Sequence, residues 1–416
     1  MKRKLFVQMR NEWRSNAWLF AELLIISIVM WYVLVFFASI VSARMDHPGY
    51  DTEGVYSLGL SWVQPDSELY DNSRSANDAY QEDKEELVRR LREIPQTEAV
   101  SLGSMILPYN YNFSGNTYTL QRIDDPDSTV RVLFSQKPLQ SEMVEVMHYE
   151  GISGETPQRL RELLDEGFVL VTENLFEAVN VEADDDAIKN VPREWTVMKY
   201  DSTTYKIGAV IRAIKRNDYE PAFYPTLVYP NRWGNELDLR VKPGCGREFE
   251  EYMDENIGKY RVGNCYISDV KSVEVIKEAN QRDIVQMMEM QLACIGFLML
   301  SIFLGLLGTF WFRTQQRVGE IAIRLANGAT RGSIFSRLIS EGLILLAIIA
   351  PLALPAYWVL LHYDLTLSYG MPDGMGMYVL CALVTFALLA LMIVLGIWFP
   401  ARKAMKIEPA LVLKSE

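Results

Sequence analysis

The sequence is poor in the residues and motifs that mark catalytic sites. Its 416 residues include only three histidines, His47, His148 and His362, and none lies at metal-ligand spacing from another. It has no phosphate-binding loop of the G-x-x-x-x-G-K-[ST] type, no G-x-S-x-G turn and no H-E-x-x-H motif. We therefore predict no catalytic residue, no metal and no cofactor in this chain, which argues against an enzyme.

Charge is almost absent from four long apolar stretches. A helix needs ~20 apolar residues to cross the ~30 Å hydrocarbon core of a bilayer. Two prolines, Pro351 and Pro355, fall inside the third stretch, where neighbouring membrane helices can satisfy the freed carbonyl groups. The stretches that meet the length requirement are 17–43, 286–312, 342–361 and 377–399.

The Lys and Arg residues predict which side of the membrane each connecting segment occupies. They gather in three short segments, 1–16, 313–341 and 400–416. In contrast, segment 44–285 carries 27 Lys and Arg against 44 Asp and Glu, and 362–376 has no Lys or Arg. Because short loops rich in Lys and Arg stay cytoplasmic, we expect a cytoplasmic N-terminus, a cytoplasmic C-terminus and an external acidic segment.

The segment before the first span allows two interpretations. Leu5, Met9 and Trp13 are four residues apart among basic residues, which predicts an amphipathic helix on the inner membrane surface. Alternatively, residues 1–43 are a cleaved secretion signal, since a basic start leads into an apolar run that ends in small residues. The apolar run of 27 residues exceeds the ~7 to 15 residues of a signal, which favours a membrane span.

Segment 44–285 mixes helical and extended patterns, which favours an α+β domain. Residues 78–94 read as a surface helix, and 98–107, 168–172 and 205–214 read as strands. From Val270 the pattern becomes helical and runs without Pro or Gly into the second span. This pattern predicts one continuous helix through residue 312, about 64 Å long at ~1.5 Å per residue.

The predicted fold is an integral membrane protein with four transmembrane α-helices and a large α+β extracytoplasmic domain inserted between helices 1 and 2. Its parts are a cytoplasmic amphipathic segment (1–16), a first span (17–43), the extracytoplasmic domain (44–285), a second span that continues an outer stalk helix (286–312), a cytoplasmic coupling loop (313–341), a third span (342–361), an outer loop (362–376), a fourth span (377–399) and a cytoplasmic tail (400–416).

Two of the four cysteines, Cys245 and Cys265, lie in the extracytoplasmic domain. That compartment is potentially oxidising, and a bridge between them would close a loop of ~20 residues. A disulfide and a pair of free thiols are both open. The other two cysteines, Cys294 and Cys381, fall inside predicted spans, where packing explains them.

The coupling loop carries the most constrained pattern in the chain. Its apolar residues recur at helical spacing, and Glu320 and Arg324 form a favourable i,i+4 pair on another face. Asn327 and Gly328 predict a turn, after which Thr330 can cap a second helix. An ordinary amphipathic linker at the membrane surface would show the same pattern.

This loop resembles the inner loop of the FtsX/MacB-like ABC transporter permease family, whose motif runs roughly E-I-A-[IV]-R-[KR]-A-L-G-A. The departures are Leu325 and Asn327, where the family usually has a basic residue and Leu. Segment 400–411 is similar to the family's ending, and segment 44–285 looks like its periplasmic core domain. The residues that match the loop motif are Glu320, Ile321, Ala322, Ile323, Arg324, Ala326, Gly328 and Ala329.

The resemblance implies a non-catalytic permease in the bacterial cytoplasmic (inner) membrane, driven by a separate cytoplasmic ABC ATPase that binds ATP and Mg. It implies a homodimer, or a heterodimer with a related permease, and coupling of the ATPase through the inner loop. Movement of the outer domain would then export a drug, peptide or other envelope substrate by mechanotransmission. The four-span layout is most similar to the macrolide-exporter branch, which works with a membrane-fusion protein and an outer-membrane channel. No nucleic-acid partner is expected.

Other functions fit the same sequence. A non-transporting mechanotransducer that activates an envelope protein and a lipoprotein-release permease share the expected fold. A membrane-bound ligand sensor is more distant, because it needs a cytoplasmic output domain and the inner segments are short.

Overall fold

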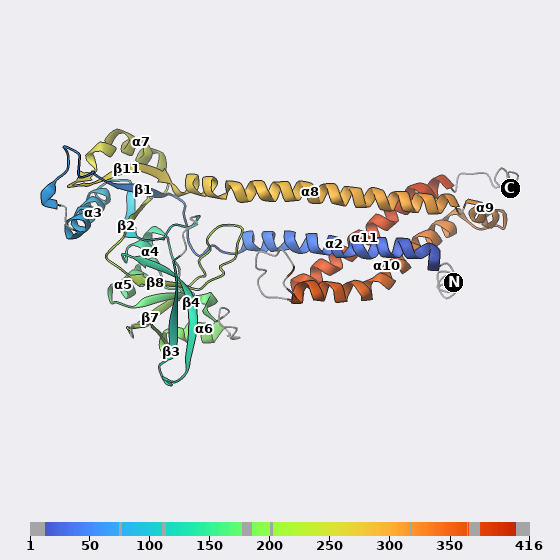
Figure 1. The fold of residues 1–416 in the computed structure, drawn as a ribbon, viewed down its shortest axis with the longest axis horizontal. Coiled ribbons are helices and arrows are strands. Elements are labelled where there is room, and N and C mark those ends of the chain that lie inside the picture. The colour runs from blue at the N-terminus through green and yellow to red at the C-terminus, as the bar shows by residue number, and fades with distance from the viewer. Residues whose placement is uncertain are drawn as a thin grey trace. The chain divides into compact units, whose positions relative to one another are not determined.

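The computed structural model divides the chain into two compact units, Arg44–Ile284 and the combination of Met1–Ala43 with Val285–Glu416. Figure 1 traces the chain and labels its elements. The structure describes residues 13–74, 77–109, 114–176, 185–199, 203–316, 318–363, 365 and 375–404.

The unit Arg44–Ile284, here called the outer domain, is built on an 11-stranded sheet in the order β10-β11-β1-β9-β2-β4-β3-β6-β7-β5-β8. Its strands are β1 (Val55–Trp62), β2 (Thr97–Gly103), β3 (Gly115–Arg122), β4 (Thr129–Leu139), β5 (Val169–Thr172), β6 (Trp195–Met198), β7 (Thr204–Ile211), β8 (Thr226–Pro230), β9 (Glu236–Val241), β10 (Arg261–Val262) and β11 (Cys265–Ser272). Its α-helices are α3 (Asn77–Arg92), α4 (Met143–Val146), α5 (Pro157–Asp165), α6 (Asp185–Glu194) and α7 (Gly246–Asn256).

Six of these strands close into a ring. β8 pairs with β5 on one side and, in parallel, with β4 on the other, so that β4-β3-β6-β7-β5-β8 returns to its start. Closure leaves these strands without the unpaired edges that invite aggregation. Buried apolar side chains such as Leu120, Phe134, Val171 and Leu227 form one core cluster of this part.

The other five strands, β10-β11-β1-β9-β2, form an open sheet that joins the ring where Gly103 of β2 faces Leu139 of β4. α3 and α7 supply buried side chains to its core, including Leu87, Leu91 and Phe249. The four-residue spacing of Leu87 and Leu91 places both on one face of α3, so burial of that face stabilises the helix.

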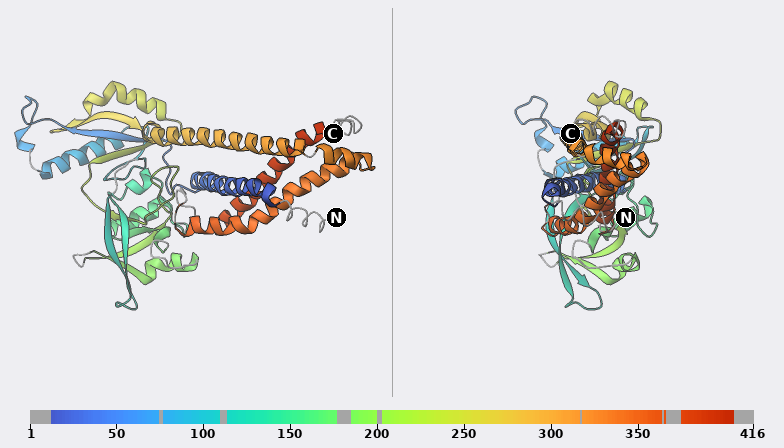
Figure 2. Two further views of the ribbon diagram at one scale, coloured as in Figure 1. Left: turned by 45° about the vertical axis from the view of Figure 1, so that its right-hand side comes forward. Right: turned by 90° about the vertical axis from the view of Figure 1, so that its right-hand side faces the viewer.

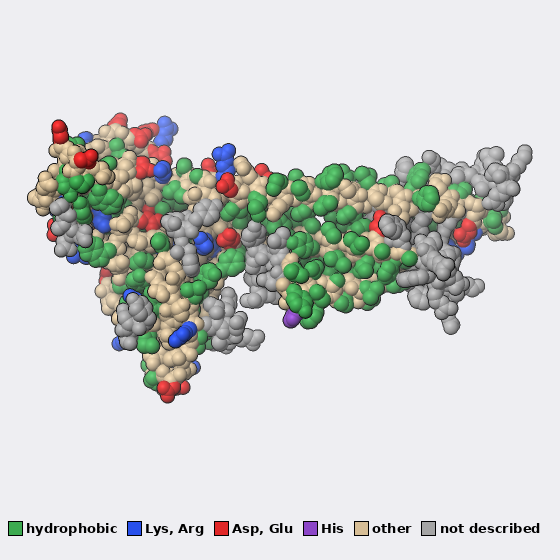
Figure 3. Space-filling model, viewed as in Figure 1, with side chains coloured by type: hydrophobic (Ala, Val, Ile, Leu, Met, Phe, Trp, Pro, Cys, Tyr) green, Lys and Arg blue, Asp and Glu red, His purple; other side chains and the backbone are tan. Residues whose placement is uncertain are grey.

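The second unit, here called the membrane unit, contains helices apolar and long enough to cross a membrane. They are α2 (Trp13–Met45), α8 (Val273–Gln316), α10 (Arg331–His362) and α11 (Met375–Ala404), and each contains an 18-residue window of mean hydropathy 2.3 or above. α8 begins in the outer domain at Val273, and the short α9 (Val318–Ala326) follows it. Figure 3 shows hydrophobic side chains along these helices, whereas most charged side chains lie on the outer domain.

Aromatic contacts hold α2, α10 and α11 together. The ring of Trp31 stacks on Tyr357 with centroids 4.5 Å apart. Its indole nitrogen donates to the carbonyl of Tyr378 at 3.3 Å. The Tyr357 hydroxyl donates to the carbonyl of Ser27 at 3.1 Å, so buried polar groups find partners within the bundle. Figure 2 shows these helices from two further directions.

The structure bears out the predicted architecture of four apolar helices and an α+β domain between the first two. The continuous helix predicted from Val270 begins at Val273, where the hydroxyl of Ser272 accepts from the amide of Val275. The strand predicted at 98–107 is too long. β2 ends at Gly103 because Met105 takes a left-handed conformation with φ 58°.

Several predicted segments fall partly outside the described residues. Of the predicted amphipathic segment 1–16, only 13–16 is described, and it belongs to α2. Of the predicted tail 400–416, only 400–404 is described, as the end of α11. In the predicted outer loop 362–376, residues 364 and 366–374 lie outside the described part.

Candidate functional site

The predicted coupling loop is a helical hairpin made of α9 and the first turns of α10. α9 ends in a Schellman motif, since the amide of Ala329 donates to the carbonyl of Arg324 at 3.0 Å and that of Gly328 to Leu325 at 3.0 Å. Gly328 has φ +86°, a conformation that glycine adopts without the steric cost of a Cβ. The Asn327–Gly328 turn expected from the sequence is therefore confirmed.

The second helix of the hairpin, α10, begins at Arg331, with Thr330 as its N-cap. The Thr330 hydroxyl accepts a hydrogen bond from the amide of Ser333 at 3.3 Å, and its backbone is extended at φ −76°, ψ 150°. An N-cap of this kind typically stabilises a helix by about 1 kcal/mol. The cap at the end of α9 and the cap at the start of α10 together define the conformation of the turn between the two helices.

A small apolar cluster holds the two helices against each other. Ile321 of α9 and Ile334 of α10 are buried, and Val318, Leu325 and Ala329 pack against them. Ala322 is also buried. The i, i+3, i+4 spacing of these residues on α9 is what the sequence predicted, and it gives the hairpin an inner face and an outer face.

On the outer face, Glu320 and Arg324 form the ion pair that the sequence predicted. The Glu320 Oε1 atom accepts from Arg324 Nη2 at 2.7 Å and from Nε at 3.0 Å. Both side chains are about 40% exposed (Arg324 39%, Glu320 40%). An exposed i,i+4 pair contributes only about 0.3 to 0.5 kcal/mol, so the hairpin does not depend on it for folding.

Ile323 lies between these two charged residues in the sequence, and 48% of its surface is exposed. Ala326, Asn327 and Gly328, at the tip of the hairpin, are exposed as well. The outer surface of the hairpin thus combines an apolar side chain, an ion pair and a turn. Of the six residues named from the sequence, Glu320, Ile323, Arg324 and Gly328 are at least partly exposed, whereas Ile321 and Ala322 are buried on the inner face.

Sequence reasoning missed two contacts that stiffen the hairpin. The side-chain amide of Asn327 donates to the carbonyl of Ile323 at 2.9 Å, which places a polar cap where the related family usually has Leu. Arg337 and Glu341 form a second i,i+4 pair at 3.5 Å, with only 23% and 13% of the side chains exposed. The four-residue spacing was the available signal for the second pair.

Cys245 and Cys265, for which the sequence left a disulfide and two free thiols open, are free thiols in the structure. Cys265 starts β11 and is fully buried in the core of the open sheet, whereas Cys245 is half-buried just before α7. Burial raises the pKa of the Cys265 thiol to about 11, and the charge of Asp83 adds to this. Because the thiolate is the reactive species, Cys265 is a poor partner for exchange while the domain stays folded.

We expect Cys245 to react with a maleimide much faster than Cys265 in the folded chain, since only Cys245 is partly exposed. Mass spectrometry of the chain under non-reducing conditions, before and after denaturation, measures both rates. A linked pair of peptides that contains both cysteines, with a mass 2 Da below the sum of the two free thiol peptides, would instead establish the disulfide.

Among the described residues, no group of three or more His, Cys, Asp or Glu side chains could hold a metal ion. The absence of catalytic, metal and cofactor residues in this chain was an expectation from sequence motifs and stays one.

Residues 292–409 match the family described as FtsX-like permease C-terminal. The match includes most of α8, all of α9 and α10, and the described part of α11. It therefore contains the whole hairpin. No curated protein matches the chain.

Two solved structures are among those similar to the chain. One is the extracellular domain of the noncanonic ABC-type transporter YknZ from Gram-positive bacteria, with 10% identity, 51% of this chain and 100% of that chain covered, and a TM-score of 0.30. The other is the periplasmic region of MacB from Actinobacillus actinomycetemcomitans, with 10% identity, 57% and 96% covered, and a TM-score of 0.31.

Proposed function

This chain carries the FtsX-like permease domain of ABC-type transporters, and from that premise we propose that it couples a separate cytoplasmic ATPase to movement of its outer domain. The observation that carries the proposal is the α9–α10 hairpin. The C-terminus of α9 and the N-terminus of α10 are both capped, and the two helices pack on an apolar cluster of their own. Ile323 is exposed beside the Glu320–Arg324 pair. Such a preorganised surface loses little conformational entropy when a partner binds.

ATP and Mg belong to the partner in this proposal. The sequence has no phosphate-binding loop of the G-x-x-x-x-G-K-[ST] type. The chain would therefore act as a non-catalytic subunit, and nucleotide binding would act on it through the hairpin.

The length of α8 supports mechanotransmission. It continues for 44 residues without a break, which corresponds to about 66 Å at ~1.5 Å per residue. A continuous helix transmits displacement along its axis better than a jointed segment. One end of α8 belongs to the outer domain and the other lies two residues before α9, so a displacement of the hairpin would act directly on the helix.

The exposure of α8 supports a second permease copy as partner. Among the described side chains of its most apolar window none is buried, whereas 28% to 44% of the window is buried in the other three candidate spans. Phe297, Leu300 and Leu304 are among the exposed apolar side chains. We infer that the working unit is a homodimer or a heterodimer with a related permease, in which part of this surface is covered.

The substrate class proposed is a drug, peptide or other envelope molecule, exported without a path between the membrane helices. A membrane-fusion protein and an outer-membrane channel would complete such a system. The non-transporting mechanotransducer, the lipoprotein-release permease and the ligand sensor are alternatives that the same fold can serve.

Co-purification tests the proposal. The chain, solubilised in mild detergent, is expected to retain a P-loop ATPase from its native membrane, and the complex is expected to hydrolyse ATP. Retention of a fusion protein as well would favour export. A chain that purifies without any ATPase, under conditions that preserve known permease complexes, would contradict the proposal.

We propose a bacterial cytoplasmic membrane location with both termini inside, and cysteine labelling tests it. In a cysteine-free background, Asp125→Cys in the β3–β4 loop is expected to react with an impermeant maleimide in cells with a permeable outer envelope. Ala326→Cys at the hairpin is expected to react only after lysis. Equal labelling of Ala326→Cys before lysis would invert the topology.

A further inference from the structure

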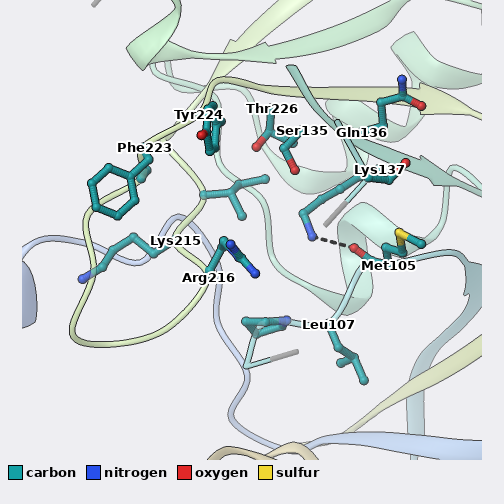
Figure 4. A pocket seen from close by; sticks show the side chains of 14 residues that line it. Met105, Leu107, Ser135, Gln136, Lys137, Lys215, Arg216, Phe223, Tyr224 and Thr226 are labelled. Atoms are coloured by element: carbon teal, nitrogen blue, oxygen red, sulfur yellow. Dashed lines mark hydrogen bonds between the residues drawn. The ribbon is translucent and has the colours of Figure 1, made fainter. Parts of the chain in front are cut away.

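A small cavity lies in the outer domain where the closed ring meets the open sheet. Its volume is about 40 Å³, and since one water needs ~10 to 15 Å³, it has room for a group of a few atoms. Figure 4 shows the cavity and the side chains around it. The lining residues are Met105, Leu107, Pro108, Ser114, Ser135, Gln136, Lys137, Ile214, Lys215, Arg216, Ala222, Phe223, Tyr224 and Thr226.

The lining has an unusual charge for this domain. Segment 44–285 has 17 more acidic than basic residues, yet the cavity is lined by Lys137, Lys215 and Arg216 and by no Asp or Glu. Lys215 points away from the cavity in Figure 4 and donates to the carbonyl of Asp46 at 3.4 Å. Of the three lining cations, Lys137 and Arg216 are therefore the two that can contact a group inside the cavity.

Lys137 is a buried cation held at the cavity wall, with only 7% of its surface exposed. Its ammonium group donates to the carbonyls of Met105 at 2.9 Å and Ile106 at 2.7 Å. The carboxylate of Glu236 accepts from the amides of Ile106 at 2.7 Å and Leu107 at 3.1 Å, which fixes the same loop from the other side. These bonds use two of the three ammonium protons, and no carboxylate of the described residues lies within ion-pair distance of the group.

Arg216 is exposed and belongs to a different segment, after β7. Figure 4 shows its guanidinium group turned toward the ammonium group of Lys137. Burial and, to a smaller extent, the charge of Arg216 lower the pKa of Lys137 to about 8, against the opposite effect of Glu236 and Asp238. Two cations thus face one small space, and an anion placed between them would relieve their repulsion.

The remaining lining supplies hydroxyl donors inside and aromatic surface at the edge. Ser135 and Thr226 face each other in the parallel pairing of β4 and β8. Phe223 and Tyr224 keep 51% and 42% of their surfaces exposed. A ligand with an anionic end and an apolar remainder would match both parts.

We propose that this cavity binds the carboxylate or phosphate group of a small amphiphilic molecule, with Lys137 and Arg216 as its cationic ligands and Phe223 and Tyr224 in contact with its apolar part. Charge-assisted hydrogen bonds to a carboxylate or phosphate are roughly twice as strong as neutral ones. The site belongs to the outer domain alone, so it does not depend on the coupling role of the hairpin.

Binding of hexanoate to the full chain in nanodiscs tests the site, with acetate, inorganic phosphate and neutral hexanol as comparison probes. Arg216→Gln is expected to weaken hexanoate binding roughly tenfold or more, the scale of one charge-assisted hydrogen bond. Arg212→Gln is the matched control, because Arg212 is exposed on the same segment, faces Glu150 at 3.6 Å and does not line the cavity. It should bind hexanoate like the wild type.

The comparison probes show whether the bound anionic group belongs to an amphiphile or is a free anion. Tighter binding of hexanoate than of acetate supports an amphiphile, whereas phosphate binding as tight as hexanoate supports a free anion and removes the apolar contact from the proposal. Equal hexanoate binding by wild type and Arg216→Gln, equal binding of hexanol, or no saturable binding of any anion would overturn the site.

Hexanoate binding is also expected to weaken as the pH rises above about 8, where Lys137 loses its proton. The titratable or charged groups that face Lys137 are Glu236, Asp238 and Arg216. Burial raises the pKa of Asp238 well above its usual value, whereas arginine keeps its charge over this range. Arg216→Gln is expected to lower the affinity and to move this loss of binding to higher pH, because the charge of Arg216 no longer lowers the pKa of Lys137. A flat profile between pH 7 and 9.5 in the wild type would contradict the role of Lys137.

Discussion

Replacing Arg240 with methionine is expected to lower the free energy of unfolding of the outer domain by about 3 to 5 kcal/mol, because its buried guanidinium group donates to three carbonyl groups and a hydrogen bond to a charged group contributes ~1.5 to 3 kcal/mol. Arg240 lies on β9 with 3% of its surface exposed. Its guanidinium group donates to the carbonyl of Val146 at 2.7 Å, to that of Glu53 at 2.8 Å and to that of Asp51. One side chain thus ties α4 and the segment before β1 to the sheet.

The loss of stability would be large because the hydrogen-bond acceptors of Arg240 would remain in the folded domain without a donor. Three carbonyl groups would lose a charged donor, and the carboxylate of Asp51, 3.1 Å from Arg240, would lose its counter-ion. Burial by itself raises the pKa of Asp51, but the amide of Glu53 and the charge of Arg240 outweigh it and hold the pKa below its usual value. The network therefore weakens as the pH falls through the folded pKa of Asp51, and it is complete above the unfolded value.

Pulse proteolysis of the full chain in nanodiscs along a urea gradient measures this change. Arg247→Met is the matched control, because Arg247 is 89% exposed and pairs with Glu251 on the surface of α7 at 2.9 Å. Its loss should change stability by less than about 0.5 kcal/mol. Equal urea midpoints for the two variants would show that Arg240 does not anchor the domain.

Reversing Glu320 to lysine is expected to weaken ATPase binding by about 30-fold to 5,000-fold, which corresponds to the ~2 to 5 kcal/mol typical of a disrupted interface ion pair. The substitution places like charges four residues apart, which costs the helix only about 0.5 kcal/mol. The apolar cluster of Ile321 and Ile334 and the caps at Gly328 and Thr330 do not involve Glu320, so the hairpin should stay folded.

The matched control is Glu251→Lys, which breaks a similar exposed i,i+4 pair on the outer domain. A second variant, Ile323→Asp, removes the exposed apolar contact while leaving the ion pair in place. Co-purification and ATP turnover should fall in Glu320→Lys and Ile323→Asp and stay normal in Glu251→Lys. If both hairpin variants are expressed normally and bind the ATPase like the wild type, the coupling role is wrong, and the hairpin is better explained as an amphipathic linker at the membrane surface.

The membrane unit was predictable because its signals are local and strong. Apolar length identified the four helices, and the Asn327–Gly328 turn followed by Thr330 identified the hairpin, since each depends on neighbours in the sequence. The ion pair of Glu320 and Arg324 followed from helical spacing alone. None of these required knowledge of distant contacts.

Single elements of the outer domain, such as the helix at 78–94 and the strand at 168–172, were predictable from local patterns. The order of its sheet was not, because the sheet depends on pairings between distant segments. β4 illustrates the difficulty, since it pairs with β3 up to Ser135 and with β8 from Ser135 onward. Its buried positions change phase at this point, from Val132 and Phe134 to Lys137 and Leu139. Strict alternation from Phe134 would turn Lys137 outward, so the cavity beside it could not be found from the sequence.

The network of Arg240 was hidden for the same reason. An arginine among Leu237, Leu239 and Val241 reads as the exposed face of a strand, with polar and apolar residues alternating. In the structure Leu237, Leu239 and Val241 of β9 pack into the core of the open sheet. The opposite face lies against α4, where Arg240 is buried and donates to the carbonyl of Val146. Burial on the second face is a tertiary property that no local pattern encodes.

The most direct test of the account is whether ATP binding by the partner moves the outer domain. In a cysteine-free chain, fluorophores at Asp125→Cys and Ala326→Cys report the distance between outer domain and hairpin in nanodiscs that contain the co-purified ATPase. A shift in transfer efficiency is expected when ATP is added to a hydrolysis-deficient ATPase, and no shift when the chain also carries Glu320→Lys. An ATPase that binds the chain and ATP while the distance distribution stays unchanged would contradict the coupling role.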